Sequence, residues 1–243
     1  TDSEIFNCPF LFKSLNNPAF KKRDQRVKRP IKPMISQHHP QPPKTRIMKK
    51  SKILMVIGSL LLLGLFVFPL WNITLEAPQY PIPLSMNIHI NKFTDVHEFD
   101  IKNINLMNHY VGMKYIPEAI PEFAIFPFVI GLMSLIGVLI GIFANYKWFL
   151  VWFIFMSVLG IAGMYDFYLW EYDYGHNLDP KAIMSFKNPD GSTMGFQPPL
   201  FGTKHILNFI AHSYPRSGAY MMFIGMVLTV VAFFVGKKEA KVS

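Results

Sequence analysis

The chain has 243 residues, of which 51% are hydrophobic and only 16% are charged, whereas soluble domains carry about 25% charged residues. Its net charge of +9 would suit a nucleic-acid partner, but residues 1–52 hold 13 Lys/Arg against 3 Asp/Glu, and residues 53–243 hold 11 against 12. The body of the chain is therefore nearly neutral, and we expect no nucleic-acid partner. The single cysteine, Cys8, excludes an internal disulfide framework, a four-cysteine zinc site and a Cys-x-x-Cys redox pair.

Residues 1–47 combine a basic run at 21–32 with a Pro/His-rich stretch at 38–43. This composition is typical of a disordered basic arm, which anionic lipids would attract. A second interpretation stays open. Residues 48–52, Met-Lys-Lys-Ser-Lys before an apolar run, are typical of the start of a bacterial membrane protein, which would make 1–47 an over-extended reading frame.

Four apolar stretches reach the roughly 18–20 residues that cross a bilayer core. They cover residues 53–71, 122–144, 148–170 and 218–236. The sequence thus predicts an all-α membrane bundle of four transmembrane helices with a small mixed α/β periplasmic cap. We expect a first transmembrane helix at 48–71, a periplasmic loop with short strands at 72–121, a transmembrane helical hairpin at 122–170, a second periplasmic loop at 171–217, and a fourth helix with a cytoplasmic tail at 218–243.

Lysines mark one side of these spans. They precede the first span, occupy the turn between the second and third, and follow the fourth, as Lys49, Lys50, Lys52, Lys147, Lys237, Lys238 and Lys241. Because short basic flanks stay in the cytoplasm, we expect both termini to be cytoplasmic in a bacterial inner (cell) membrane, with the lipid bilayer as a partner.

Two segments of the first exported loop alternate between apolar and polar residues, as half-buried strands do. Residues 86–91 place three apolar side chains on one face, and residues 99–106 alternate with a phase slip at 102–103 that suggests a bulge. The sequence predicts a small antiparallel hairpin or sheet here.

The second exported loop begins with acidic residues at the membrane boundary. Asp166 lies inside or just under the predicted interface, where a carboxylate needs a partner or water, and Glu171 and Asp173 follow it. These three form a polar interfacial cluster, which together with His176 could bind a proton or a hard cation, or could simply satisfy polar groups. Further on, residues 203–213 fit a short interfacial helix.

All six histidines after residue 48 lie in exported segments, where imidazole and thioether ligands would suit copper. The candidate metal ligands are Met107, His109, Met113, His176, His205 and His212. On a helix, His205 and His212 would be roughly 10 Å apart, so one metal could not bind both, and donors from the two loops would have to meet. No spacing matches an established chelating motif, and solvated loop histidines are the alternative interpretation.

Three runs are distinctive: DFYLWEYDYGHNLDPKAIMSF at 166–186, QPPLFGTKHILNF at 197–209 and INLMNHYVGM at 104–113. They resemble a family of small multi-pass membrane proteins encoded in nitrous oxide reductase gene clusters of the Sec-exported type. The resemblance covers about residues 48–234. It implies a role in the maturation or support of a periplasmic copper enzyme of denitrification, with the 107–113 and 166–176 segments as candidate copper ligands or docking surface, and it brings no catalytic residues.

The residues favour a role other than catalysis, since no phosphate-binding loop, Gly-x-Ser-x-Gly or His-Glu-x-x-His motif is present. We expect an accessory protein for a periplasmic copper enzyme, which acts by copper contact or by docking to the reductase or its maturation proteins. One alternative is a quinol-linked electron-delivery component that binds quinone near Asp166, Tyr168 and His176. A purely structural scaffold is the other alternative.

Overall fold

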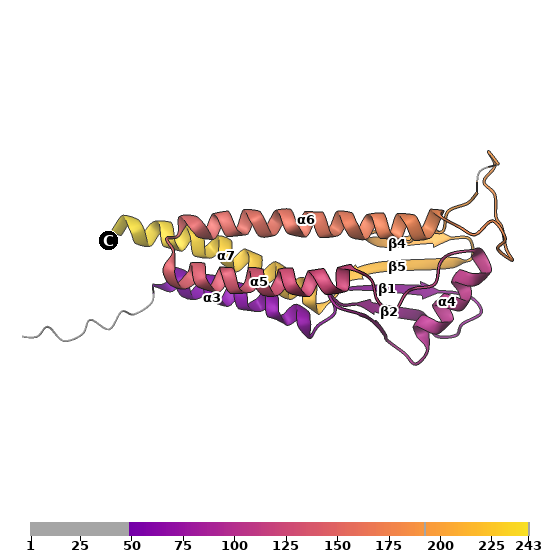
Figure 1. The fold of residues 1–243 in the computed structure, drawn as a ribbon, viewed down its shortest axis with the longest axis horizontal. Helices are drawn as coiled ribbons and strands as arrows, with labels where there is room; N and C mark the ends of the chain where they lie inside the picture. Colours follow the sequence, from indigo (N-terminus) through magenta and orange to yellow (C-terminus); the bar gives the residue numbers. More distant parts are fainter. Residues whose placement is uncertain (1–48, 192, 243) are drawn as a thin grey trace, which may run out of the picture. The chain divides into compact units, whose positions relative to one another are not determined.

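The computed structural model describes residues 49–191 and 193–242 (Figure 1). The predicted basic arm at 1–47 lies outside the described residues. In chain order the elements are α3 (Lys50–Leu61), the 3-10 helix η1 (Leu62–Phe66), β1 (Trp71–Glu76), β2 (Leu84–Ile88), β3 (Phe93–Asp95), α4 (Asp100–Val111), α5 (Glu122–Phe143), α6 (Lys147–His176), β4 (Gly202–Ile206), β5 (Phe209–Pro215) and α7 (Ser217–Val242).

Helices α5, α6 and α7 are long and apolar enough to cross a membrane. They match three of the four predicted spans in position, length and composition. The first predicted span is instead a short α-helix that continues as a 3-10 helix over residues 50–66, below the length of the other three. It ends shortly before Pro69, because proline cannot continue a helix.

The α3–η1 segment packs on α7 and α5. Glycine makes the closest approach possible: a Cβ added to Gly58 would lie 2.8 Å from the Gly225 carbonyl oxygen, and one added to Gly225 would lie 2.6 Å from the Gly58 oxygen. The buried core of the bundle includes Met55 and Trp152. The indole N–H of Trp152 donates to the Met133 carbonyl oxygen at 3.0 Å. Small residues here allow backbone contact between helices, as in other membrane bundles.

The three lysine groups lie at one end of the bundle. The Lys52 ammonium donates to the Ile142 carbonyl oxygen at the end of α5, and Lys147 begins α6. The Ser51 hydroxyl donates to Glu239 at 2.7 Å, in the last turns of α7. The sheet lies at the opposite end (Figure 1), so the predicted separation of the lysines from the loops is present in the fold.

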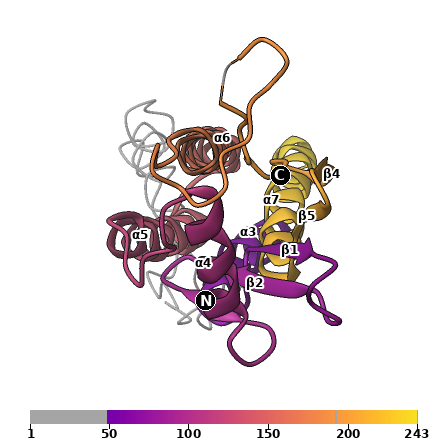
Figure 2. The ribbon, with the colours of Figure 1, turned by 90° about the vertical axis from the view of Figure 1, so that its right-hand side faces the viewer.

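The cap contains an antiparallel sheet in the order β3-β2-β1-β5-β4. Its apolar face, which includes Ile73, Met86 and Ala211, is buried against residues of α4 and α6 (Figure 2). The indole N–H of Trp71 donates to the buried Ser213 hydroxyl at 2.7 Å and thus joins β1 to β5 on this face. The predicted antiparallel sheet is confirmed. Of the alternation predicted at 86–91, residues 86–88 lie in the last part of β2.

The strand predicted at 99–106 is wrong, because this segment belongs to α4. The buried side chains Asp100, Ile104, Asn108 and Val111 recur with helical spacing. The Asp100 carboxylate accepts the backbone N–H groups of Ser85 and His97 at 3.1 and 2.8 Å, which fixes the start of the helix against β2. The short alternation at 99–106 was thus also compatible with one face of a helix.

The interfacial helix predicted at 203–213 is also wrong. These residues form the β4–β5 hairpin, in which Ile206 pairs with Phe209 across a two-residue turn. Leu207, the first turn residue, has a φ of 56°. Two-residue hairpin turns usually carry Gly or Asn where φ is positive, so a leucine there gave no turn signal.

We predict that Leu207→Gly stabilises the protein. A positive φ at only the first residue of a two-residue turn is the type II′ pattern, which has glycine at that position, and it costs leucine roughly 1–2 kcal/mol. Thermal unfolding in detergent should therefore shift upward. The control is Leu106→Gly at an exposed position of α4, which should lower the midpoint because glycine destabilises a helix interior. An unchanged or lower midpoint for Leu207→Gly would contradict the turn geometry.

We also predict that Gly225→Ala destabilises the bundle, since its methyl group would displace α3 from α7. Overpacking of this kind costs typically about 1–3 kcal/mol. The matched control is Gly160→Ala on α6, where a Cβ would meet no atom of the described residues within 4 Å. Unfolding in detergent should separate the two variants, with only Gly225→Ala unfolding at lower temperature.

Candidate functional site

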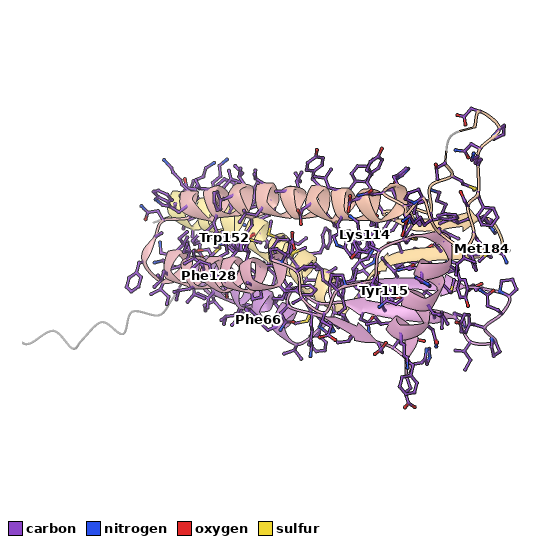
Figure 3. All side chains as sticks on the ribbon, turned by 45° about the vertical axis from the view of Figure 1, so that its right-hand side comes forward. Phe66, Lys114, Tyr115, Phe128, Trp152 and Met184 are labelled. Atoms are coloured by element: carbon purple, nitrogen blue, oxygen red, sulfur yellow. The ribbon has the colours of Figure 1, made fainter. Side chains whose placement is uncertain are left out.

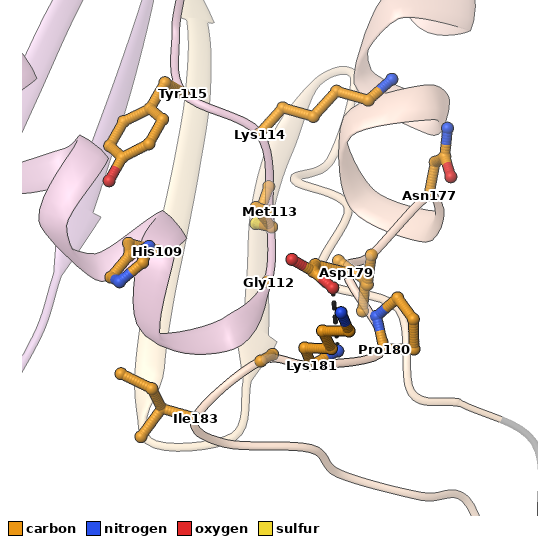
Figure 4. Close-up of a pocket in the computed structure, with 12 residues that line it drawn as sticks. His109, Gly112, Met113, Lys114, Tyr115, Asn177, Asp179, Pro180, Lys181 and Ile183 are labelled. Carbon is orange, nitrogen blue, oxygen red and sulfur yellow. Dashed lines mark hydrogen bonds between the residues drawn. The ribbon is translucent and has the colours of Figure 1, made fainter.

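A pocket of about 490 Å³ lies between the end of α4 and the loop that follows α6 (Figure 4). One wall comes from His109 and the segment 112–115, and the other from residues 177–183. This volume is within the range of small-ligand pockets. The site is therefore built from two segments that the sequence analysis predicts to be exported.

Backbone contacts hold the two walls together. Gly112 ends α4 with a φ of 81°, and its carbonyl oxygen accepts the N–H of Asp179 at 2.8 Å. A Cβ on Gly112 would lie 2.8 Å from the Ala182 Cβ, so this approach requires glycine. A second backbone contact joins the same segments: the Met184 N–H donates to the Tyr110 carbonyl oxygen at 2.9 Å.

The last turns of α6 also contact the 112–115 wall of the pocket. The Lys114 ammonium lies 2.6 Å from the Asp173 carboxylate, and the Tyr174 hydroxyl donates to the Tyr115 carbonyl oxygen at 2.8 Å. The hydrogen bond from Lys114 lowers the pKa of Asp173. Both ion-pair partners are about half exposed, so the pair orients the segment more than it stabilises it.

Several large exposed side chains lie at the pocket or next to it in the chain. The His109 ring stacks on Tyr115 with centroids 6.0 Å apart and lies 6.3 Å from the Tyr110 ring. Tyr110, Tyr115, Ile183 and Met184 are all more than 40% exposed; we call these four residues the tip patch. Tyr115 and Met184 lie on the cap, away from the bundle residues Trp152 and Phe128 (Figure 3).

Of the six candidate metal ligands, the fold brings His109 and Met113 to the same pocket. Met107 packs against the sheet core, and His176 stacks on Tyr172 and hydrogen-bonds its carbonyl oxygen. His205 and His212 lie on β4 and β5. Within residues 49–191 and 193–242, no group of three or more His, Cys, Asp or Glu side chains could hold a metal ion. The six candidates therefore do not share one site.

The three acidic residues of α6 also separate. Asp166 is half-buried, and Asp173 is exposed and bonded to Lys114. Glu171 is fully buried, and neither of its carboxylate oxygens has a hydrogen-bond partner in the described residues. These positions give three different environments rather than one interfacial cluster.

Glu171 lies beyond the part of α6 that a membrane would enclose. A helix of 30 residues is about 45 Å long, and a bilayer core of about 30 Å takes about 20 of them. The helix begins at Lys147, so its last turns reach the cap, where Trp170 packs against Phe93 of β3. Burial raises the pKa of the Glu171 carboxyl to about 8, and nearby Lys204 acts weakly in the opposite direction.

One polar chain was missed by sequence reasoning, because the segment that carries it was predicted as a helix. On the sheet, the Thr203 hydroxyl lies 2.8 Å from His212 Nδ1, and His212 Nε2 lies 3.2 Å from the Glu76 carboxylate. The sequence carries no alternation that would reveal this strand, because the buried residues are the small Ala211 and Ser213, whereas Ile210, His212 and Tyr214 are on the less buried face.

Comparisons with protein-family models, with curated proteins and with solved structures find no match to this chain.

We predict that Gly112→Ala disorders the pocket wall, because the new methyl group meets Ala182 and Asp179 and also strains the backbone. Hydrogen exchange at residues 177–184 should become at least several-fold faster. The matched control is Gly191→Ala, which has the same positive φ but no described atom within 4 Å of the added Cβ. Equal exchange in the two variants would show that backbone strain alone, and not the contact, matters.

Proposed function

We propose that the protein is an integral membrane accessory factor whose cap docks onto an extracytoplasmic copper enzyme or its maturation proteins, with nitrous oxide reductase as the first candidate. The tip patch is the observation that supports docking. The identity of the partner rests on the resemblance of the 104–113, 166–186 and 197–209 segments to proteins encoded with that reductase.

The position of the tip patch supports a protein partner over lipid. Two of its residues, Tyr115 and Met184, lie on the cap and not on the bundle (Figure 3), and all four of its side chains are exposed. Exposed apolar side chains that cluster outside the bilayer mark interaction sites, and Tyr and Met are enriched at such interfaces. Met also adapts its shape to a partner surface.

The proposal includes a fourth span and a fixed orientation. The α3–η1 segment packs along α7 and α5, so a membrane that encloses those two helices would enclose it as well. Its N-terminal end lies beside the end of α5 and the last turns of α7, where the lysines gather. The positive-inside rule then places this end in the cytoplasm and the cap in the periplasm.

Copper contact is a second candidate function, and one observation favours it. His109 and Met113 line the same pocket, so an imidazole and a thioether could reach one Cu(I) ion together with a donor from the partner. For the quinol alternative, Asp166 and His176 are ten residues apart on one helix, which corresponds to about 15 Å, and no described contact joins them.

Site-specific photo-crosslinking tests the docking proposal. A photoreactive residue at Tyr115 should give a crosslink to the reductase or a maturation protein in cells that express both, identified by mass spectrometry. The control position is His205, which is exposed on β4 of the same cap. Crosslinks to the enzyme from His205 but not from Tyr115, or from neither position, would contradict docking through the tip patch.

The copper proposal has its own test in purified protein. Titration with Cu(I) against a competing chelator should show one ion bound, with affinity at least tenfold weaker for both His109→Ala and Met113→Leu. His205→Ala is the matched control and should bind as the unmodified chain does. Stoichiometric binding that survives both substitutions would place copper elsewhere, and binding no stronger than the background would reject the metal role while leaving docking intact.

A further inference from the structure

Glu171 is enclosed where the last turns of α6 meet the sheet. Phe167 and Gly175, one turn before and after it, lie on the same face of the helix. The Phe167 ring lies 5.9 Å from the ring of Trp71 on β1, and the Gly175 carbonyl oxygen accepts the Phe196 N–H at 2.8 Å. A Cβ on Gly175 would overlap the Gln197 backbone, so no space separates helix and loop here.

Among the described residues one cation acts on the Glu171 carboxyl, and the His176 imidazole, five residues further along α6, stacks on Tyr172 instead. The covered face of the sheet is apolar on β1 and β2, β5 contributes Ala211 and Ser213, and the segment 194–201 has no ionisable side chain. On α4 the buried Asp100 already accepts hydrogen bonds from Ser85 and His97. On α6 itself, Asp173 pairs with Lys114 at the surface.

Lys204 of β4 is that cation, and it is engaged elsewhere. Its ammonium donates to the Gln197 carbonyl oxygen at 3.0 Å and lies on an exposed side chain. Neither oxygen of Glu171 receives a hydrogen bond in the described residues. An ionised carboxylate in this environment would be a buried charge without a donor, which is strongly unfavourable, so the neutral acid is the form that fits.

We propose that Glu171 is a proton-binding site that holds α6 on the sheet while it is protonated, and that loss of the proton draws Lys204 from Gln197 to the carboxylate. The proton goes to bulk water, and loss of the hydrogen bond between Lys204 and Gln197 releases the segment 197–204, whose two ends that bond joins. The raised pKa of Glu171 is consistent with this change occurring in the accessible pH range. The inference depends on the fold alone and not on copper or on a partner.

The movement would reach the pocket. Asp173 and Tyr174, which hold the pocket wall through Lys114 and Tyr115, directly follow Glu171 on the same helical turn. In the orientation proposed above, a site of this kind lets the pH of the extracytoplasmic solution alter the surface that the cap presents.

Infrared spectroscopy of the whole chain in detergent tests the proton directly. At about pH 6 the spectrum should contain a protonated carboxyl band that Glu171→Gln removes, and this band should disappear as the pH rises through about 8. The matched control, Asp173→Asn, removes an exposed carboxylate two residues away and should leave the band unchanged. A spectrum at pH 6 in which Glu171→Gln removes no such band would overturn the proposal.

Hydrogen exchange tests the movement. Amides 197–204 should exchange roughly tenfold faster at about pH 9 than the intrinsic pH dependence predicts, and Glu171→Gln should abolish this excess. An excess that persists in Glu171→Gln overturns the coupling. Lys204→Met serves as the second variant if Glu171→Gln does not fold: by removing the one cation, it should shift the loss of the carboxyl band to higher pH, and an unshifted band would overturn the role of Lys204.

The stability of the protein should follow the same site. The pKa of Glu171 in the folded chain lies above that of an unfolded glutamate, so its contribution to stability is fully present below about pH 4.5 and is lost as the pH rises through about 8. The difference in unfolding temperature between Glu171→Gln and the unmodified chain should therefore favour the variant most at alkaline pH. A difference that does not change with pH would contradict the site.

Discussion

One antiparallel chain pairing runs through the whole described molecule. Helices α3 and α7 meet at Gly58 and Gly225 in the bundle, and the strands that adjoin them, β1 and β5, pair in the centre of the sheet. At the junction, the Arg216 N–H donates to the Leu70 carbonyl oxygen at 3.0 Å. The same two segments thus connect the bundle to the centre of the sheet.

Helix α6 is attached in a different way. Near its start, Phe149 and Trp152 are buried in the bundle core, and near its end, Glu171 and Gly175 are buried against the cap. Between these two contacts a Cβ at Gly160 would meet no described atom within 4 Å. The two ends are thus supported by apolar packing and backbone hydrogen bonds, whereas the buried acid places a titratable group within one of the supports.

The sequence was sufficient for features that depend on long, uniform composition. Long runs without charge identified α5, α6 and α7, and the lysines that flank the apolar runs predicted which helix ends lie at the same end of the bundle. Shorter segments were ambiguous. Residues 99–106 satisfied a two-residue period by chance, while burial of Asp100 and Ile104 follows the helical one. The β4–β5 turn depends on a leucine with positive φ, which no propensity would suggest.

The candidate site was predicted only in part, for a physical reason. Spacing along the chain placed His109 and Met113 close together, and the short turn at Gly112 keeps them at one pocket. Contacts between distant segments were not accessible in this way. The burial of Glu171, for example, requires β1, β5 and the 194–201 segment to be in place around it, and nothing in the local sequence distinguishes it from the exposed Asp173.

The strand order also determines when the cap can be completed. β1 pairs with β2 soon after both are made, but its other edge must wait for β5, more than 130 residues later in the chain. During synthesis the half-sheet β1–β3 therefore has an open edge while two further helices insert. Unpaired edges invite association with other chains, so this interval is when the protein is most exposed to misassembly. Slow translation would prolong this interval, and a higher concentration of incomplete chains would make association more frequent. Neither would change the stability of the finished fold.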